Sequence, residues 1–353
     1  MKNRKPEYTI PLGLLLAAFC ASASAQHPAP VPAAPSTVQA VYVDPSASRA
    51  LQPGEKIGGL YARNTTQDYV LQRLTQRTYW VQSHHYASVF YVGDKGVLLF
   101  DALEGQSPQI RKAIAEVTKL PISALVYSHD HADHIGDAKE FVAAAVSAGV
   151  KLRIIASKAT AAKMTFLKSA FPKPTETVAW PSGSFKFEGL TVSFHGFERA
   201  AHTDDHGIWL LEGEKVAHLP DLINPDQPPF WAFAGSENFV YYEANLEQLA
   251  KLDWTYLSGG HGNVGSRADV EFYRLFLADL KAAVGKAVKE IPWGVGVDAS
   301  KANAHTPFLP AWMNAVARQA TDQLRPKYGK YYGFEAGMPR NAEMVAEAMT
   351  AYR

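Results

Sequence analysis

The sequence Ser128-His129-Asp130-His131-Ala132-Asp133-His134 holds three imidazoles and two carboxylates within seven residues. It follows an apolar run, Ile122 to Tyr127, that predicts a buried strand. Packing does not explain such a cluster, since burying His and Asp carries a desolvation cost. Imidazole and carboxylate together are ligands of zinc and related cations. On an extended segment, residues two apart point the same way, so His129 and His131 face one ion and the residues after them face a second.

Composition places the chain among ordinary globular proteins. It has 353 residues, a formal net charge of +1 and 47% hydrophobic residues. This length suits one large domain, or one domain with an appendage. The near-neutral charge gives no reason to expect nucleic acid or an anionic membrane surface as a partner.

The N-terminus resembles a secretory signal. Lys2, Arg4 and Lys5 precede a short apolar run, and an Ala-x-Ala pattern ends at Ala25. We therefore expect cleavage near Ala25, a periplasmic or secreted location and no stable membrane anchor, because the run is short for a membrane span. An uncleaved anchor or lipid attachment at Cys20 is the less favoured alternative. Cys20 is the only cysteine, so the mature chain lacks disulfides and thiolate ligands.

Four segments follow from the patterning. Residues 1–25 are the signal peptide, 26–78 a leader and N-terminal extension, 79–290 the main domain and 291–353 a helical C-terminal extension. Within the main domain, strand-turn-strand patterns alternate with helical ones. We expect strands at 88–92, 97–100, 122–127, 152–156, 184–187, 190–194, 208–211, 215–219 and 255–257, and helices at 110–120, 135–148, 157–170, 240–252 and 270–291. Two more helices are expected at 310–324 and 341–352. This mixture fits stacked sheets with helices outside.

Three further metal-capable residues lie at predicted strand ends: His202, Asp221 and His261. Taken singly, each would more often serve a hydrogen bond. Together with the cluster at 129–134, they supply two triplets of ligands and one bridge. A two-metal hydrolase needs such a set, with ions about 3.5–4 Å apart.

The segment His129–His134 resembles the H-x-H-x-D-H signature of the metallo-β-lactamase superfamily. The hairpin from Val89 to Asp101, Ala201-His202-Thr203, Asp221 and Gly260-His261-Gly262 resemble further family motifs in the same order. The resemblance covers about residues 79 to 290. It implies an α/β (α+β) fold, a four-layer αββα sandwich with the site on loops at one edge.

The resemblance also implies a ligand set. His129, His131 and His202 would hold the first metal, Asp133, His134 and His261 the second, and Asp221 would bridge them. We expect two Zn²⁺ per chain, with Fe or Mn as alternatives. In the expected mechanism, a metal-bridging hydroxide attacks the substrate, and Asp133 is the catalytic residue that orients it and passes a proton to the leaving group. Asp101 would hold a ligand histidine by its free N–H, or would be a plain strand-end residue.

The chain departs from the family pattern in two places. Pro220 stands where the family has Gly before the bridging Asp, and proline fixes φ and removes a donor. Ala200-Ala201 stands where the family has Pro-Gly. His206 is an alternative to His202 as a ligand, and motif position favours His202.

An aromatic stretch follows Asp221. Phe230, Trp231 and Phe233, together with His85 before the first hairpin, are expected to line a pocket and to bind the substrate. The alternative for the aromatic residues is packing on the core. If they line the pocket, the substrate is a small molecule with an apolar portion.

Three functions are in competition. The first is a secreted dinuclear zinc hydrolase of a small ester, lactone or related electrophile, which the bridging Asp221 favours. The second is a β-lactamase, which export favours and the absence of a cysteine ligand disfavours. The third is an iron-dependent sulfur dioxygenase or a non-catalytic metal-binding protein. The C-terminal helices would either cap the pocket or form a homodimer interface.

Overall fold

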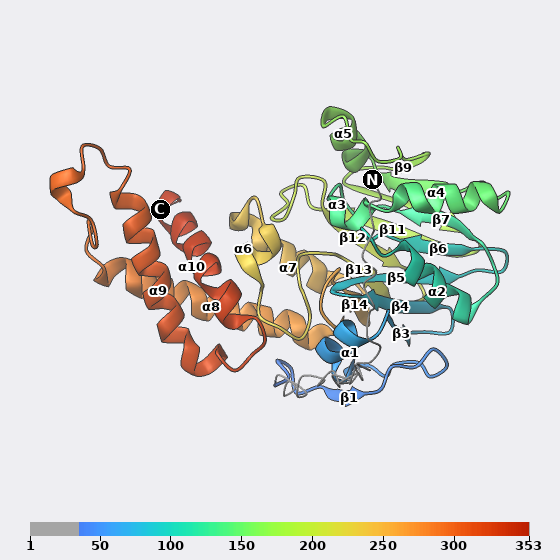
Figure 1. The fold of residues 1–353 in the computed structure, drawn as a ribbon, viewed down its shortest axis with the longest axis horizontal. Helices are drawn as coiled ribbons and strands as arrows, with labels where there is room; N and C mark the ends of the chain where they lie inside the picture. Colours follow the sequence, from blue (N-terminus) through green and yellow to red (C-terminus); the bar gives the residue numbers. More distant parts are fainter. Residues whose placement is uncertain (1–34, 353) are drawn as a thin grey trace, which may run out of the picture. The chain divides into compact units, whose positions relative to one another are not determined.

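The computed structural model describes residues 35–352, and its centre is a pair of β-sheets (Figure 1). The first sheet has seven strands in sequence order: β3 (Val70–Arg73), β4 (Thr78–Ser83), β5 (Tyr86–Val92), β6 (Val97–Phe100), β7 (Ile122–Val126), β8 (Arg153–Ser157) and β9 (Glu176–Val178). Strands β3 to β6 pair antiparallel, and β6 to β9 pair parallel.

The second sheet has six strands, also in sequence order: β10 (Ser182–Phe187), β11 (Leu190–Gly196), β12 (Gly207–Leu211), β13 (Val216–His218), β14 (Tyr256–Ser258) and β15 (Val264–Gly265). Only β13 and β14 pair parallel, so their carboxyl ends share one edge. A separate two-stranded sheet joins β1 (Val41–Val43) and β2 (Glu55–Ile57).

Helices lie between the strands and after them. They are α1 (Leu60–Thr66), α2 (Ser107–Val117), α3 (Ala132–Ile135), α4 (Ala138–Ser147), α5 (Lys158–Phe166), α6 (Trp231–Gly235), α7 (Tyr242–Lys251), α8 (Arg267–Glu290), α9 (Phe308–Tyr328) and α10 (Phe334–Ala351), with 3₁₀ turns η1 (Phe239–Tyr241) and η2 (Ala299–Lys301). Ser157 caps α5, accepting a hydrogen bond from the N–H of Thr160. None of the described helices is long and apolar enough to span a membrane.

Alternation along the strands creates the layers. In β6, Val97 and Leu99 face a core shared with α2 and α4, whereas Leu98 and Phe100 face the second sheet. In the second sheet, β12 likewise directs one set of side chains to the first sheet and the other to a core with α7 and α8. The three apolar cores therefore lie helix on sheet, sheet on sheet and sheet on helix. This confirms the predicted αββα sandwich.

The C-terminal extension is helical, as predicted, and it shares its core with the domain. Helices α9 and α10 pack on one another and on α8, as Figure 1 shows in orange and red. Trp312, Val316 and Val345 belong to the same buried cluster as the inner residues of α7 and α8. We attribute the stability of the extension to this common core, since a helix pair alone buries little.

Three details differ from the sequence-based expectations. The first sheet begins at Val70, within the segment expected to precede the domain. The helix expected over 135–148 begins later, at Ala138 of α4, and the N–H of Asp137 before it bonds the carbonyl of Ala102. Residues Ala232 to Ala234 adopt a left-handed turn, which no propensity predicts for non-glycine residues. The expected signal peptide lies outside the described residues.

Candidate metal centre

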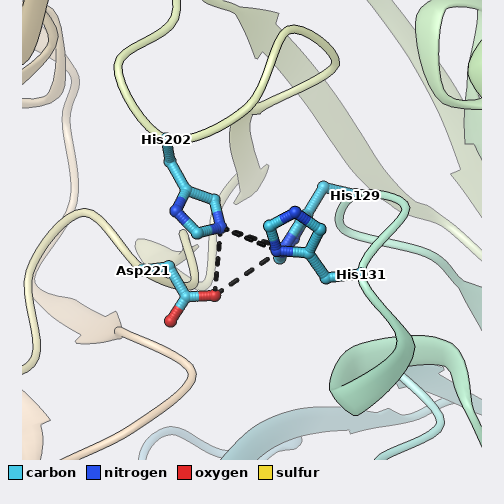
Figure 2. A group of neighbouring side chains, drawn as sticks. All are labelled: His129, His131, His202 and Asp221. Atoms are coloured by element: carbon cyan, nitrogen blue, oxygen red, sulfur yellow. Dashed lines mark hydrogen bonds and ion pairs between the residues drawn. The ribbon is translucent and has the colours of Figure 1, made fainter. Parts of the chain in front are cut away.

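Loops at one edge of both sheets carry the candidate ligands. His129 follows β7, and Asp133 and His134 lie in the short helix α3. His202 lies on the loop between β11 and β12. Asp221 and His261 follow the parallel strands β13 and β14. The edge therefore gathers side chains from distant parts of the chain, as Figure 2 shows for four of them.

The first ligand group comprises His129, His131, His202 and one oxygen of Asp221. Nε2 of His202 lies 3.1 Å from Nδ1 of His131 and 3.3 Å from Nε2 of His129. Oδ2 of Asp221 lies 3.5 Å from Nε2 of His202 and 3.6 Å from Nε2 of His129. Figure 2 shows these four side chains pointing toward one another.

These separations suit one tetrahedral ion. Ligand atoms about 2.0–2.1 Å from a zinc ion stand about 3.3–3.4 Å from one another at the corners of a tetrahedron. The four distances of the first group, 3.1 to 3.6 Å, surround that value. The first ligand group therefore fits a metal of the zinc type.

The second ligand group comprises Asp133, His134 and His261. Oδ2 of Asp133 lies 3.5 Å from Nε2 of His134 and 3.7 Å from Nε2 of His261. Asp221 also faces this group: Oδ2 lies 3.0 Å from Nε2 of His134, and Oδ1 lies 3.2 Å from Nε2 of His261. Asp221 thus contacts both groups, in the position of a bridge.

Unsatisfied polar atoms also favour a metal here. Nε2 of His134 and Oδ1 of Asp221 are buried, and neither has a hydrogen bond with acceptable geometry to a described residue, although each lies near a charged partner. Buried polar atoms normally find a hydrogen-bond partner. A cation between the side chains would satisfy both atoms, so the donor set fits one.

Protonation differs between the two groups. Burial, together with the neighbouring histidines, holds the pKa of His129 and that of His202 well below the ordinary value. Burial acts the same way on His134 and His261, but carboxylates outweigh it. Asp221 and Asp101 raise the pKa of His134, and Asp221 and Asp133 raise that of His261 to about 9. His129 and His202 are therefore ready to bind a cation at neutral pH, whereas His134 and His261 must release protons.

Asp101 supports both groups from behind, one of the two roles considered for it. Its Oδ2 lies 3.1 Å from Nδ1 of His134 and accepts from Oγ of Ser128 at 2.9 Å. The Ser128 hydroxyl in turn lies 3.0 Å from Nδ1 of His129. Both imidazoles thus use Nδ1 for support and keep Nε2 for the centre. Burial opposes ionisation of Asp101, but hydrogen bonds from His134 and His218 lower its pKa.

His261 is oriented by the backbone instead. Its Nδ1 donates to the carbonyl oxygen of His85 at 2.9 Å, which leaves Nε2 toward the second group. Close packing surrounds it, because a Cβ on Gly260 would lie 2.6 Å from Cβ of Pro220 and 2.9 Å from Cε1 of His134. Residue 260 also has φ of 76°, a second reason for glycine.

Although Pro220 stands where the family has glycine, Asp221 keeps its position between the two ligand groups. Asp221 has φ of 67°, which Asp tolerates better than most residues, and its N–H bonds the carbonyl of Gly259 at 3.0 Å. Nε2 of His206 donates to the carbonyl of Pro220 at 2.6 Å. His206 therefore fastens the segment before Asp221, and His202 is the residue that the structure brings into the first group. Burial lowers the pKa of His206 to about 4, so it stays neutral.

Of the four residues expected to bind substrate, three lie near His261 or at the surface and one is buried in the core. The Phe230 ring lies 5.7 Å from that of His261, and Trp231 is 57% exposed. His85 is exposed and adjoins His261 through its carbonyl. Phe233 does not join them: it is 1% exposed and packs between Phe239 and Tyr242. The left-handed turn directs Phe233 into the core, so its expected role in binding is corrected to packing.

Sequence reasoning missed the partners of Asp101. Nε2 of His218 lies 2.9 Å from Oδ2 of Asp101, and the opposite nitrogen lies 3.1 Å from Oγ of Ser258. His218 lies within the predicted strand 215–219, and no motif in the sequence marks its partner. The serine of the signature, Ser128, was likewise visible only as part of the motif.

Comparisons agree with this geometry. The family described as "Metallo-beta-lactamase superfamily" matches residues 84–261, and the chain belongs to it. No curated protein matches.

Solved structures are similar in fold at low sequence identity. Metallo-beta-lactamase IND-7 shares 19% identity and a TM-score of 0.50, over 60% of this chain and 99% of that one. DIM-1 metallo-beta-lactamase shares 11% sequence identity at a TM-score of 0.50, over 60% of this chain and 98% of that one. A metallo-beta-lactamase from Pontibacter korlensis shares 16% sequence identity at a TM-score of 0.49, over 59% of this chain and 99% of that one. At these identities the likeness concerns the fold alone.

Proposed function

We propose that this protein is an exported, dinuclear zinc-dependent hydrolase of a small carbonyl ester or lactone. The observation that carries the proposal is the position of Asp221. One carboxylate oxygen faces His202 and His129, and both oxygens face the second group. A carboxylate shared in this way supports two ions at the spacing that two-metal hydrolysis requires.

When bound, such ions polarise the substrate's carbonyl and lower the pKa of water to near neutrality. The chain's own residues supply the remainder. The buried histidines fix the ligand geometry, and Asp101 holds two of them in the required tautomer through its contacts with His134 and Ser128.

Asp133 is the residue placed to move a proton. Its side chain is 35% exposed, whereas that of Asp221 is 5% exposed, so Asp133 faces the side from which substrate arrives. Burial would raise its pKa, but the neighbouring imidazoles of His261 and His134 lower it, which keeps the carboxylate ionised. It can accept a proton from the attacking water and return it to the leaving group.

The test is hydrolysis by zinc-loaded protein of a panel of aryl esters, alkyl esters and lactones, with a chromogenic cephalosporin included. We expect turnover of an ester or lactone, its loss in a chelator and its return with zinc. Turnover of the cephalosporin alone would assign the protein to the β-lactamases that its structural neighbours are named as. Two bound zinc ions with no turnover on any member would contradict the proposal.

A further inference from the structure

Aromatic rings surround the exposed side of the second ligand group. The rings of Tyr86 and Phe230 lie 5.1 and 5.7 Å from that of His261. Beyond them, Tyr61 stacks on His85 at 6.3 Å with an angle of 25° between the planes. Tyr332 lies 5.5 Å from Tyr61.

We define the aromatic shelf as Tyr61, His85 and Tyr332. Tyr61 is 46% exposed and Tyr332 is 49% exposed, although a Tyr ring is often largely buried. The shelf connects directly to the centre, because the carbonyl of His85 accepts the hydrogen bond that orients His261. Tyr61 contacts both other rings, so three exposed rings joined through Tyr61 lie beside a metal-binding residue and form a surface for another ring.

Two of the three shelf residues lie outside the region that defines the family. The family match covers residues 84–261, whereas Tyr61 belongs to α1 and Tyr332 to the turn between α9 and α10. The N-terminal and C-terminal extensions therefore meet at Tyr61 and Tyr332, next to the metal centre. This gives the extensions a role that packing alone does not require.

The C-terminal extension also fixes the loop that carries Phe230. Asn341 of α10 is fully buried; its Oδ1 accepts from the N–H of Phe233 at 2.9 Å, and its Nδ2 donates to the carbonyl of Pro229 at 2.6 Å. Gly337 lies one turn earlier on the same helix, and a Cβ there would lie 3.2 Å from the backbone of Phe230. Helix α10 thus fixes the backbone before and after Phe230, whose ring contacts that of His261.

We infer that the aromatic shelf is a recognition subsite for an uncharged aryl group of the substrate. This inference rests on the proposed function, since it assigns the ring to the ester or lactone cleaved at the adjacent centre. Ring faces favour planar partners by offset stacking or edge contacts, and Tyr tolerates one wet and one apolar side.

The inference is tested by binding two carboxylates, phenylacetate and acetate, which differ by the ring alone. Calorimetry on zinc-loaded and on chelator-treated full-length protein gives both Kd values. We expect the wild type to prefer phenylacetate, and the double variant Tyr61→Ala/Tyr332→Ala to lose about two- to tenfold of that preference, the worth of one aromatic pair. Acetate binding should not change.

Two controls keep the result interpretable. The double variant Tyr61→Phe/Tyr332→Phe retains the rings and should retain the preference. Tyr352→Ala removes a tyrosine that is 75% exposed and belongs to no ring contact among residues 35–352, so it should behave as wild type. Thermal unfolding of each variant reports whether it folds.

Equal affinity of the wild type for both carboxylates would overturn the inference, as would full preference in the double alanine variant. The proposed function fails differently. If zinc does not bind or no ester is cleaved while the ring preference persists in chelator-treated protein, the subsite stands and the hydrolase assignment falls.

Discussion

The two ligand groups are built from similar side chains but are supported in different ways. The first is deeply buried at His129 and His202, and the pKa values of these residues are depressed. The second is partly exposed at Asp133 and His261, and its histidines are held charged by carboxylates. The first group thus presents neutral imidazoles at His129 and His202, whereas the histidines of the second exchange protons beside the exposed Asp133. We therefore expect substitutions in the second group to lower the rate of the reaction more than substitutions elsewhere in the centre.

The largest difference between the groups should appear in the variant Asp133→Asn. Loss of the proton-carrying carboxylate is expected to lower kcat by about 10²- to 10⁴-fold, the usual worth of general acid–base catalysis. The first group should keep its zinc, because Asp133 does not belong to it. Steady-state kinetics and zinc content measure the two effects. Asp94→Asn changes a carboxylate that is 69% exposed and should leave both unchanged.

Because protons compete with zinc for histidine nitrogens, the zinc affinities of the two groups should depend differently on pH. His261 has its pKa raised to about 9, so zinc must displace its proton below that pH. Affinity at the second group is expected to rise about tenfold per pH unit for each displaced proton, up to about pH 9. At the first group, where the pKa values of His129 and His202 are depressed, zinc affinity should change little between pH 7 and 9. Zinc titrations at several pH values measure this, and parallel slopes at both groups would contradict it.

The same shift predicts the stability of chelated protein. A folded-state pKa raised from 6.5 to about 9 stabilises the fold fully below pH 6.5, and this contribution is lost as pH rises through 9. Denaturant unfolding of metal-free protein should therefore show declining stability over that window. Bound zinc removes the titrating proton and should flatten the profile.

A smaller effect is expected from Asp101→Asn. Removal of the charge behind His134 should weaken zinc binding at the second group by about 10- to 100-fold. The first group should weaken less, because Asp101 reaches His129 only through the hydroxyl of Ser128. Equal losses at both groups would show that the two are not supported separately.

The smallest effect concerns the C-terminal extension. Asn341→Ala leaves the N–H of Phe233 and the carbonyl of Pro229 buried without a partner, which should lower the free energy of unfolding by about 1–3 kcal/mol. Asn314→Ala removes an exposed asparagine of α9 and should cost little. Chemical denaturation compares them. An Asn341 variant as stable as the Asn314 variant would remove the argument that α10 fixes this loop.

The sandwich fold and the ligand set could be predicted from the sequence, because the patterns that indicate them are local. The signature at 128–134, the alternation in 88–100 and the helical spacing in 270–291 each lie within a short window, and the sandwich follows from them. The residues His202, Asp221 and His261 were identified by motif, and the structure brings them to the same edge.

What could not be predicted depends on contacts between distant segments. His218 meets Asp101 across 117 positions, and Asn341 meets Phe233 across 108. Phe233 was expected at the pocket because its composition suits a wall, but the left-handed turn reverses its direction. Tyr61 and Tyr332 carry no motif at all, and only the folded extensions bring them together.

Zinc stoichiometry tests the central claim most directly. Chelator-stripped wild type and the variant His261→Ala are dialysed against zinc at pH 8, and bound metal is counted by mass spectrometry. Two separate groups sharing Asp221 predict two zinc ions in the wild type and one in the variant, retained at His129, His131 and His202. One ion in the wild type, or loss of both in the variant, would contradict the account.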